Sequence, residues 1–193
     1  MNTPPLRAGR NGNRGFTLAE IVIVVGLATI LFGALSYIYV GFVRTYPRLD
    51  ASLSITAGAG AITDATHEAG LQATRVVTSH VFSGITYASG GTVVVFELPA
   101  IDSAGAIVSG AYDYIGIYAS GNEAYSITDA DPASSRIDGT KKLTDTLAEL
   151  SFTYDTPNPS LTTSVHVAAT TSAVVRDETI TFHTRTFVPL RNL

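Results

Sequence analysis

The hydrophobic pattern divides the chain into three parts, and the first is one long apolar run. From Ile21 to Val43 no residue carries a charge, and this run of 23 residues is bounded by Glu20 and Arg44. As an α-helix at ~1.5 Å per residue the run is about 34 Å long, which is enough to cross the ~30 Å hydrocarbon core of a bilayer. The sequence therefore predicts one membrane-spanning helix near the N-terminus.

The segment after this run has the period of an amphipathic helix. Between Asp50 and His80, apolar and small residues recur mostly at intervals of three or four, which places them on one helix face. We expect a helix over residues 46–80, with a bend or restart at Pro47 because proline removes one amide donor. The residues of the predicted face are Ile55, Ala59, Ile62, Ala65, Ala69, Ala73, Val76 and Val77.

Glycines interrupt this predicted helix at Gly58, Gly60 and Gly70. Each one weakens a helix by ~1 kcal/mol relative to alanine. Together with the neighbouring alanines they also leave a surface that another backbone can approach closely. The helix can therefore pack on its own domain with one face and on another chain with the opposite face.

From residue 81 onward, alternation and short runs rich in Val, Ile, Thr, Tyr and Phe predict strands. Hairpin turns are expected at Ser89-Gly90-Gly91 and at Ser120-Gly121-Asn122, each between two strand-like runs. Residues 147–155, 163–170 and 178–190 supply later strands, which makes about seven in all. The expected fold is α+β, a long N-terminal helix packed on a C-terminal antiparallel β-sheet, with surface loops at Asp102–Gly110 and Asp129–Thr140.

The charge distribution orients the predicted span. Arg7, Arg10 and Arg14 precede it with no acid among residues 1–15, so the net charge of −4 includes +3 from this leader and leaves −7 on the other residues. Positive charge is retained on the cytoplasmic side of membranes, so the leader is expected inside and the β-rich domain outside. An acidic domain is a poor match for a phosphate backbone, so no direct nucleic-acid partner is expected.

Several kinds of chemistry have no support in the sequence. Cysteine is absent, which excludes disulfides, thiolate nucleophiles and Cys-ligated metals. No common catalytic, phosphate-binding or dinucleotide motif is present, so we expect no enzyme and no cofactor. The run Asp129–Pro132 lacks the ligand spacing of a calcium loop, so we expect no metal there. His166 and His183 are expected to be ordinary sheet residues, and His67 and His80 solvent-facing or capping residues.

The residues just before the span, Arg14 to Glu20, read RGFTLAE. A secretory signal peptide would have an apolar region of only ~7 to 15 residues and a cleavage site of small residues, and no such site follows Val43. Glu20 instead places a carboxylate at the edge of the apolar helix. On insertion scales such a charge costs ~2.5 to 3.5 kcal/mol at a helix centre and less near the interface, so it indicates a function.

Two interpretations of Glu20 follow. It can stabilise the first helical turn, where negative charge is favourable. It can also be neutralised by an amine of another chain. If the Gly15–Phe16 bond is cut, the new α-amino group of Phe16 lies at the same depth as Glu20. Because a straight helix separates these two groups within one chain, the amine of a neighbouring subunit is the better partner.

A basic leader, the sequence GFTLAE and a long apolar helix, in this order, resemble the signal of type IV prepilins and type II secretion pseudopilins. The resemblance implies that a prepilin peptidase cuts after Gly15 and methylates the amine of Phe16, and that Glu20 guides assembly. The implied partners are this peptidase, other pilin or pseudopilin subunits, an inner-membrane assembly platform, and membrane lipid before assembly. The implied location is the inner membrane, as a single-pass protein with a cytoplasmic N-terminus, and then an extracytoplasmic filament.

The C-terminal half, through GNEAYSI, LAELSFTYD and the terminal FVPLRNL, is similar to minor subunits of the J or W type. This similarity implies a structural subunit, a minor pilin or pseudopilin. The expected organisation is a leader (1–15), a transmembrane and filament-core helix (16–45), an amphipathic helix (46–80) and a β-rich domain (81–193). An alternative from another class is a membrane-displayed adhesive or ligand-binding module, which would use the loops Asp102–Gly110 and Asp129–Gly139. A further alternative is a membrane-anchored enzyme, to which no residue can be assigned.

Overall fold

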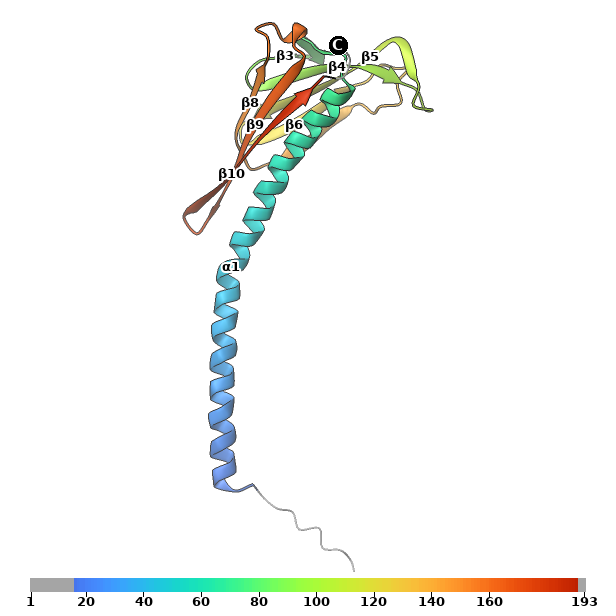
Figure 1. Ribbon diagram of the computed structural model, residues 1–193. Helices are drawn as coiled ribbons and strands as arrows, with labels where there is room; N and C mark the ends of the chain where they lie inside the picture. The colour runs from blue at the N-terminus through green and yellow to red at the C-terminus, as the bar shows by residue number, and fades with distance from the viewer. Residues whose placement is uncertain (1–15, 191–193) are drawn as a thin grey trace, which may run out of the picture. The chain divides into compact units, whose positions relative to one another are not determined.

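The computed structural model in Figure 1 describes residues 16–190. Helix α1 (Leu18–Gln72) comes first, and all the strands follow it. The chain divides into two compact units, the first ending at Tyr46 and the second beginning at Pro47. Pro47 lies inside α1, and the helix is assigned without interruption through it. A long N-terminal helix followed by antiparallel sheets confirms the predicted α+β class.

The second unit contains three antiparallel sheets, and the described residues form ten strands where about seven were expected. The largest sheet has the order β1 (Arg75–Val76), β4 (Val93–Ile101), β5 (Ile107–Ser120), β6 (Glu123–Asp129), β7 (Gly139–Thr144). A three-stranded sheet has the order β10 (Glu178–Pro189), β9 (Ser164–Val175), β8 (Leu147–Tyr154), and β2 (Ser79–Phe82) pairs with β3 (Ile85–Ala88). A short 3-10 helix, η1 (Pro159–Leu161), precedes β9.

The second half of α1 packs on the sheets, as its period predicts (Figure 1). Ile55, Ala59, Ile62 and Ala69 are all buried, at intervals of three, four and seven residues. They belong to the same face because 3.6 residues complete one turn. The main core joins this face to residues of β4, β5, β8 and β9, so the domain is organised around the helix.

Helix α1 ends at Gln72 and not near residue 80, as the sequence analysis expected. The N–H of Ala73 closes the last turn on the carbonyl of Gly70, and the N–H of Thr74 already bonds the carbonyl of Glu97 in β4. Val76 then pairs with Phe96. The β-branched residues after Gln72 favour a strand. The spacing of the apolar residues there fits a helix and a strand equally well, so pairing with β4 determines where the helix ends.

The first predicted hairpin lies elsewhere in the chain. The turn is at Ser83-Gly84, where β2 meets β3 with Phe82 opposite Ile85, and not at Ser89-Gly90-Gly91. Ser83 and Gly84 both have positive φ, 48° and 87°, as a two-residue hairpin turn of type I′ requires. The Ser-Gly pair is a turn signal in its own right, and the sequence analysis did not use it.

The later strands follow the predictions closely. The turn at Gly121-Asn122 joins β5 to β6, with Ser120 opposite Glu123, and β8, β9 and β10 occupy the three expected segments. Strand β7 was not predicted. Its sequence GTKKLT is polar and exposed over most of its length, as an edge strand often is, so alternation does not mark it.

Two glycines of α1 allow the sheets to approach the helix. A Cβ atom at Gly70 would lie 2.2 Å from Cγ1 of Val188 in β10, and one at Gly58 would lie 2.2 Å from Oγ1 of Thr144 in β7. These contacts are shorter than van der Waals distances, so both positions require glycine. Gly60, by contrast, has no heavy atom within 4 Å of a Cβ position. Gly58 and Gly70 therefore serve packing within the domain.

We predict that Gly70→Ala destabilises the domain by about 1–3 kcal/mol, because the added methyl group forces Val188 or the strand to move. Gly60→Ala is the matched control and should leave stability unchanged or raise it by up to ~1 kcal/mol, since only helix propensity changes. Chemical unfolding of the detergent-solubilised chain, followed by circular dichroism, measures both. Equal effects of the two substitutions would contradict the close packing at Gly70.

Candidate functional site

Helix α1 begins with a reciprocal pair of hydrogen bonds between Thr17 and Glu20. The backbone N–H and the hydroxyl of Thr17 both donate to Oε2 of Glu20, at 2.8 and 2.9 Å, and the N–H of Glu20 donates to Oγ1 of Thr17 at 3.2 Å. This is a capping box, which satisfies amide donors that the first turn of a helix leaves unpaired. The spacing T-x-x-E in the sequence is its signature.

The capping box uses only one oxygen of the Glu20 carboxylate. Within residues 16–190, Oε1 of Glu20 takes part in no hydrogen bond. A carboxylate can accept several bonds, so Oε1 remains available for a donor from outside the chain. The two interpretations of Glu20 are therefore compatible, because the same side chain can cap its helix and bind an amine.

The predicted processing site is only partly visible. Phe16 is the first described residue, and its side chain is exposed. Gly15 and the leader arginines Arg7, Arg10 and Arg14 lie outside the described residues.

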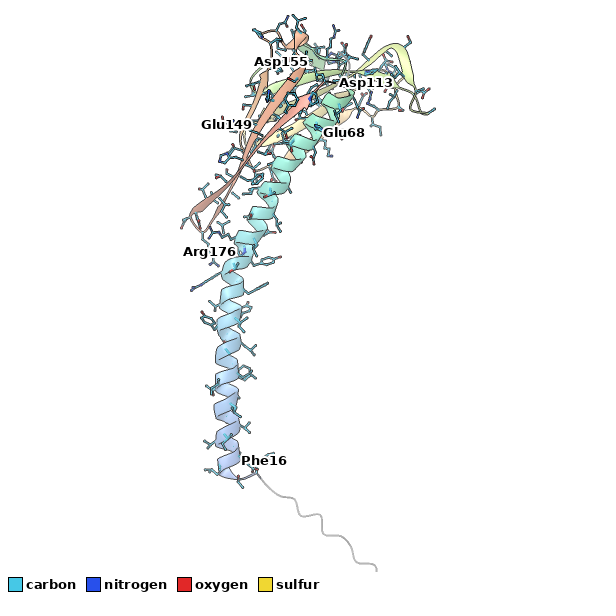
Figure 2. The ribbon with its side chains drawn as sticks, in the orientation of Figure 1. Phe16, Glu68, Asp113, Glu149, Asp155 and Arg176 are labelled. Carbon is cyan, nitrogen blue, oxygen red and sulfur yellow. The ribbon has the colours of Figure 1, made fainter. Side chains whose placement is uncertain are left out.

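The first part of α1, up to Tyr46, is almost entirely apolar, and its large side chains are exposed. Figure 2 shows the side chains of α1 after Phe16 projecting outward on all sides, and 16 large hydrophobic side chains between Ile21 and Val43 are exposed. Burying a side chain of this kind stabilises by roughly 1.5–3 kcal/mol, so leaving all of them in water would cost tens of kcal/mol. By length and composition α1 is able to cross a membrane, and it is the one such helix within residues 16–190. Its first half needs lipid or other protein around it.

The profile of the prokaryotic N-terminal methylation motif matches residues 10–36, which include Gly15, Phe16 and Glu20. The chain is a type IV pilin-like protein. The motif implies processing by a prepilin peptidase. No curated protein and no solved structure matches the chain. The hydrophobic helix is consistent with a pilin anchored in the membrane before assembly, and this family is typically non-enzymatic.

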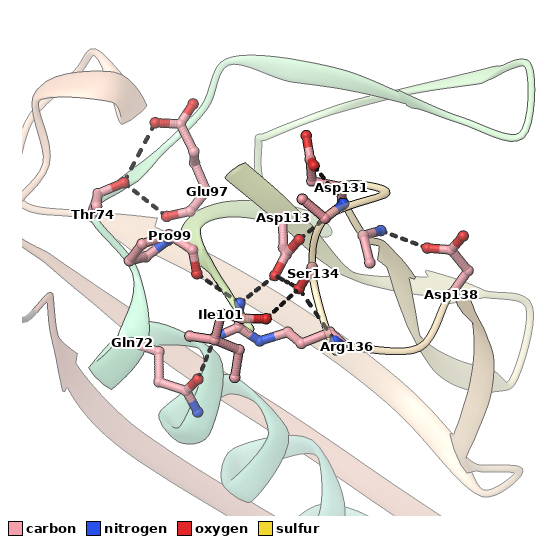
Figure 3. A network of polar contacts seen from close by, with 12 residues as sticks. Gln72, Thr74, Glu97, Pro99, Ile101, Asp113, Asp131, Ser134, Arg136 and Asp138 are labelled. Atoms are coloured by element: carbon pink, nitrogen blue, oxygen red, sulfur yellow. Dashed lines mark hydrogen bonds and ion pairs between the residues drawn. The ribbon is translucent and has the colours of Figure 1, made fainter. Parts of the chain in front are cut away.

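The other polar centre of this pilin-like protein is a buried ion pair in the β-domain (Figure 3). Asp113 in β5 is fully buried, and Arg136, from the loop between β6 and β7, bonds its Oδ2. The same guanidinium donates to the carbonyl of Pro99 in β4 at 2.7 Å and to Oε1 of Gln72, the last residue of α1, at 2.8 Å. Arg136 therefore fastens the loop to two strands and to the end of the helix.

Two further hydrogen bonds reach the carboxylate oxygens of Asp113. The hydroxyl of Ser134 donates to its Oδ2 at 2.7 Å, and the N–H of Asp131 donates to its Oδ1 at 2.8 Å. A buried carboxylate is tolerated only when it is paired and hydrogen-bonded, and Asp113 meets both conditions. The loop Asp129–Gly139 is thus held in one conformation. Sequence spacing does not indicate this pair, because its two residues are far apart in the chain.

The acids of the run Asp129–Pro132 have separate partners. Asp129 accepts from Nε2 of His80 at 2.7 Å, and the side chain of Asp131 accepts from the N–H of Ala133 at 2.9 Å. No group of three His, Asp or Glu residues able to hold a metal occurs within residues 16–190. Their geometry is that of loop and sheet contacts.

Of the histidines, His80 differs from its prediction. It lies in strand β2 with its side chain mostly covered, and its ring stacks on Tyr114 at 3.7 Å. His67 is exposed on α1, as expected. His166 and His183 are exposed sheet residues, as predicted, and contact Phe187 and Thr170 respectively.

The strongly perturbed groups of the β-domain have structural causes. Hydrogen bonds from the side chains of Thr162 and Thr163 lower the pKa of Asp155 to about 2. Burial raises the pKa of Tyr154 and that of Tyr118 to about 12. The tyrosines remain neutral at physiological pH and Asp155 remains charged. Asp155, Tyr154 and Tyr118 do not bond one another, so they do not form an acid–base pair.

We predict that Asp113→Asn destabilises the domain by roughly 3–5 kcal/mol, because it leaves the guanidinium of Arg136 mostly buried without its counter-charge. Glu178→Gln is the control. It removes the exposed Arg48–Glu178 pair, whose atoms lie 3.0 Å apart, and should cost about 0–1 kcal/mol. Thermal and chemical unfolding measure both variants. Similar small losses in the two would show that the buried pair does not hold the loop.

Proposed function

We propose that this pilin-like protein is a structural subunit, a minor pilin or pseudopilin, of a type IV pilus-like or type II secretion filament. The observation that carries the proposal is an exposed apolar helical segment that begins at the methylation motif and continues into a folded domain. Such a segment must be surrounded first by lipid and then by other apolar helices. A filament built from the same segments provides the second environment.

Processing is proposed at the Gly15–Phe16 bond. Cleavage by the prepilin peptidase removes the leader with Arg7, Arg10 and Arg14, and methylation modifies the amine of Phe16. The α-amino group stays cationic after methylation, so it keeps its attraction for a carboxylate. Removal of the leader arginines also removes the charges that hold the N-terminus in the cytoplasm.

Glu20 is proposed to guide assembly. Its Oε1 carries no hydrogen bond within residues 16–190 and its Oε2 is fixed by Thr17, so the carboxylate is held in one orientation. Opposite charges attract far more strongly in an apolar environment than in water. The amine of Phe16 from a neighbouring subunit would therefore set the axial position of one helix against the next.

The partners and locations follow from this cycle. The subunit waits in the inner membrane with its helix inserted, its N-terminus in the cytoplasm and its β-domain outside. An assembly platform then transfers the helix from lipid into the filament, where it meets other pilin or pseudopilin subunits. The minor role is proposed from the resemblance of the segments GNEAYSI, LAELSFTYD and FVPLRNL to J-type and W-type subunits. No nucleic-acid partner is needed at any step.

The direct test is Glu20→Ala in a host that contains a prepilin peptidase and a matching assembly machine. We expect normal removal of the leader and at least a tenfold loss of the subunit from sheared filaments, because the unpaired amine is then buried without a counter-charge. Glu68→Ala, on the exposed side of the same helix, is the matched control and should assemble normally. Undiminished assembly of Glu20→Ala would refute the docking role.

A further inference from the structure

The outer face of the β8-β9-β10 sheet is hollowed along its middle. Two adjoining cavities, of about 500 and 570 Å³, open on this face and share Ser151, Ala168 and Arg185. These three residues form one cross-strand row, since Ser151 pairs with Ala168 and Ala168 with Arg185. Ser151 and Ala168 have small side chains, so the surface is depressed where they lie. We call this hollow the outer trough.

The outer trough is separate from the packing face of the same sheet. Side chains alternate between the two faces of a strand, and the buried residues Val167 and Ala169 of β9 point to the core. Ala168 between them points the other way. Helix α1 packs against the core side, so the packing of α1 on its own domain leaves the outer trough exposed.

Two charged side chains in the walls of the trough have no bonding partner within residues 16–190. Arg185 on β10 and Glu149 on β8 are exposed, and neither has an ion pair or hydrogen bond within residues 16–190. Figure 2 labels Glu149 on this sheet. His183 next to Arg185 bonds the hydroxyl of Thr170 through Nδ1 at 2.9 Å. Other charged residues of the domain, such as Lys142 and Arg75, have carboxylate partners.

One end of the trough is aromatic. The rings of His166 and Phe187 lie 5.1 Å apart at 59° to each other, on neighbouring strands. Phe187 is 56% exposed, although it is a large hydrophobic side chain. An aromatic ring placed beside a guanidinium and a carboxylate offers an apolar surface together with directional polar contacts.

We propose that the outer trough binds a short oligosaccharide that contains a carboxylated sugar. The ring of Phe187 stacks on the C–H face of one sugar, Arg185 pairs with the sugar carboxylate, and Glu149 accepts from hydroxyl groups. From Thr170 to His166 the floor is about 13 Å long at ~3.3 Å per residue, which leaves room for roughly two to three sugar rings. The charged side chains of Arg185 and Glu149 in its walls do not fit an apolar helix as the occupant.

Charge selects the acidic ligand over other classes. Among the residues that line the two cavities, Arg185 is the one arginine or lysine. The cavity that holds Phe187 has no acidic residue in its lining, so a carboxylate bound there can pair with Arg185. A nucleic-acid strand requires several cations along its backbone, and the trough offers one arginine facing a glutamate. A carboxylated oligosaccharide has fewer charges and many hydroxyl groups, and so matches these residues better.

The experiment uses the full chain in phosphatidylcholine nanodiscs and isothermal titration calorimetry. The probes are trigalacturonate and sialyllactose, with the methyl ester of trigalacturonate as the uncharged match and a thymidine hexanucleotide as the nucleic-acid probe. We expect at least one of the two acidic sugars to bind, the ester to bind about tenfold more weakly or worse, and the hexanucleotide not to bind.

Three variants locate the binding. Arg185→Gln should weaken binding of the acidic sugar about tenfold, and Ala168→Phe should abolish it by filling the floor. Lys141→Gln, on β7 of the other sheet, removes the same charge and should change nothing. Circular dichroism checks that each variant is folded. Absence of binding by both acidic sugars, equal binding of the ester, preference for the hexanucleotide, or unchanged binding by Arg185→Gln would each overturn the proposal.

Discussion

An uncharged helical segment whose large apolar side chains are exposed is the constraint on which the structure depends. The apolar side chains from Ile21 to Val43 face outward on every side, so the chain is stable only where lipid or other protein replaces water. The polar residues at the start of this segment must therefore be compatible with an apolar environment. Thr17 and Glu20 close the first turn by a capping box, which removes unpaired amides from the apolar environment.

The same helix changes its role after Pro47. There it becomes the centre of the β-domain, and its buried face consists mainly of isoleucine, alanine and glycine, which lets two sheets pack closely on it. Arg136 lies in the long loop between β6 and β7, and its guanidinium binds the end of the helix and two strands (Figure 3). One helix thus joins a segment that requires an apolar environment to a domain that requires water.

The sequence predicted what depends on local pattern. Ile55, Ala59 and Ile62 were found by spacing, and the turn at Gly121-Asn122 by its residue types. The helix end at Gln72 was missed because Ala73 and Val76 fit both periods, and only pairing with β4 distinguishes them. Strand β7 was missed because an exposed edge has no alternation. Asp113 and Arg136 were missed because a contact between distant residues leaves no trace in spacing.

The candidate sites also contain some features that the sequence predicts and others that need the structure. Gly15, Phe16 and Glu20 belong to a contiguous motif, so the sequence alone is enough to propose them. The capping partner Thr17 is marked by T-x-x-E spacing, but only the structure shows that one oxygen of Glu20 remains available. The outer trough was invisible in sequence, because it is formed by residues from three strands whose register had to be known.

The central claim is that the chain is a processed prepilin, and the most direct test is mass spectrometry of its mature N-terminus. The wild type and Gly15→Leu would be purified from membranes of a host with an active prepilin peptidase. The account predicts a wild-type chain that begins at N-methylated Phe16, and a variant that retains residues 1–15. A wild-type chain with its leader still attached in that host would contradict it and would leave a plain membrane-anchored domain.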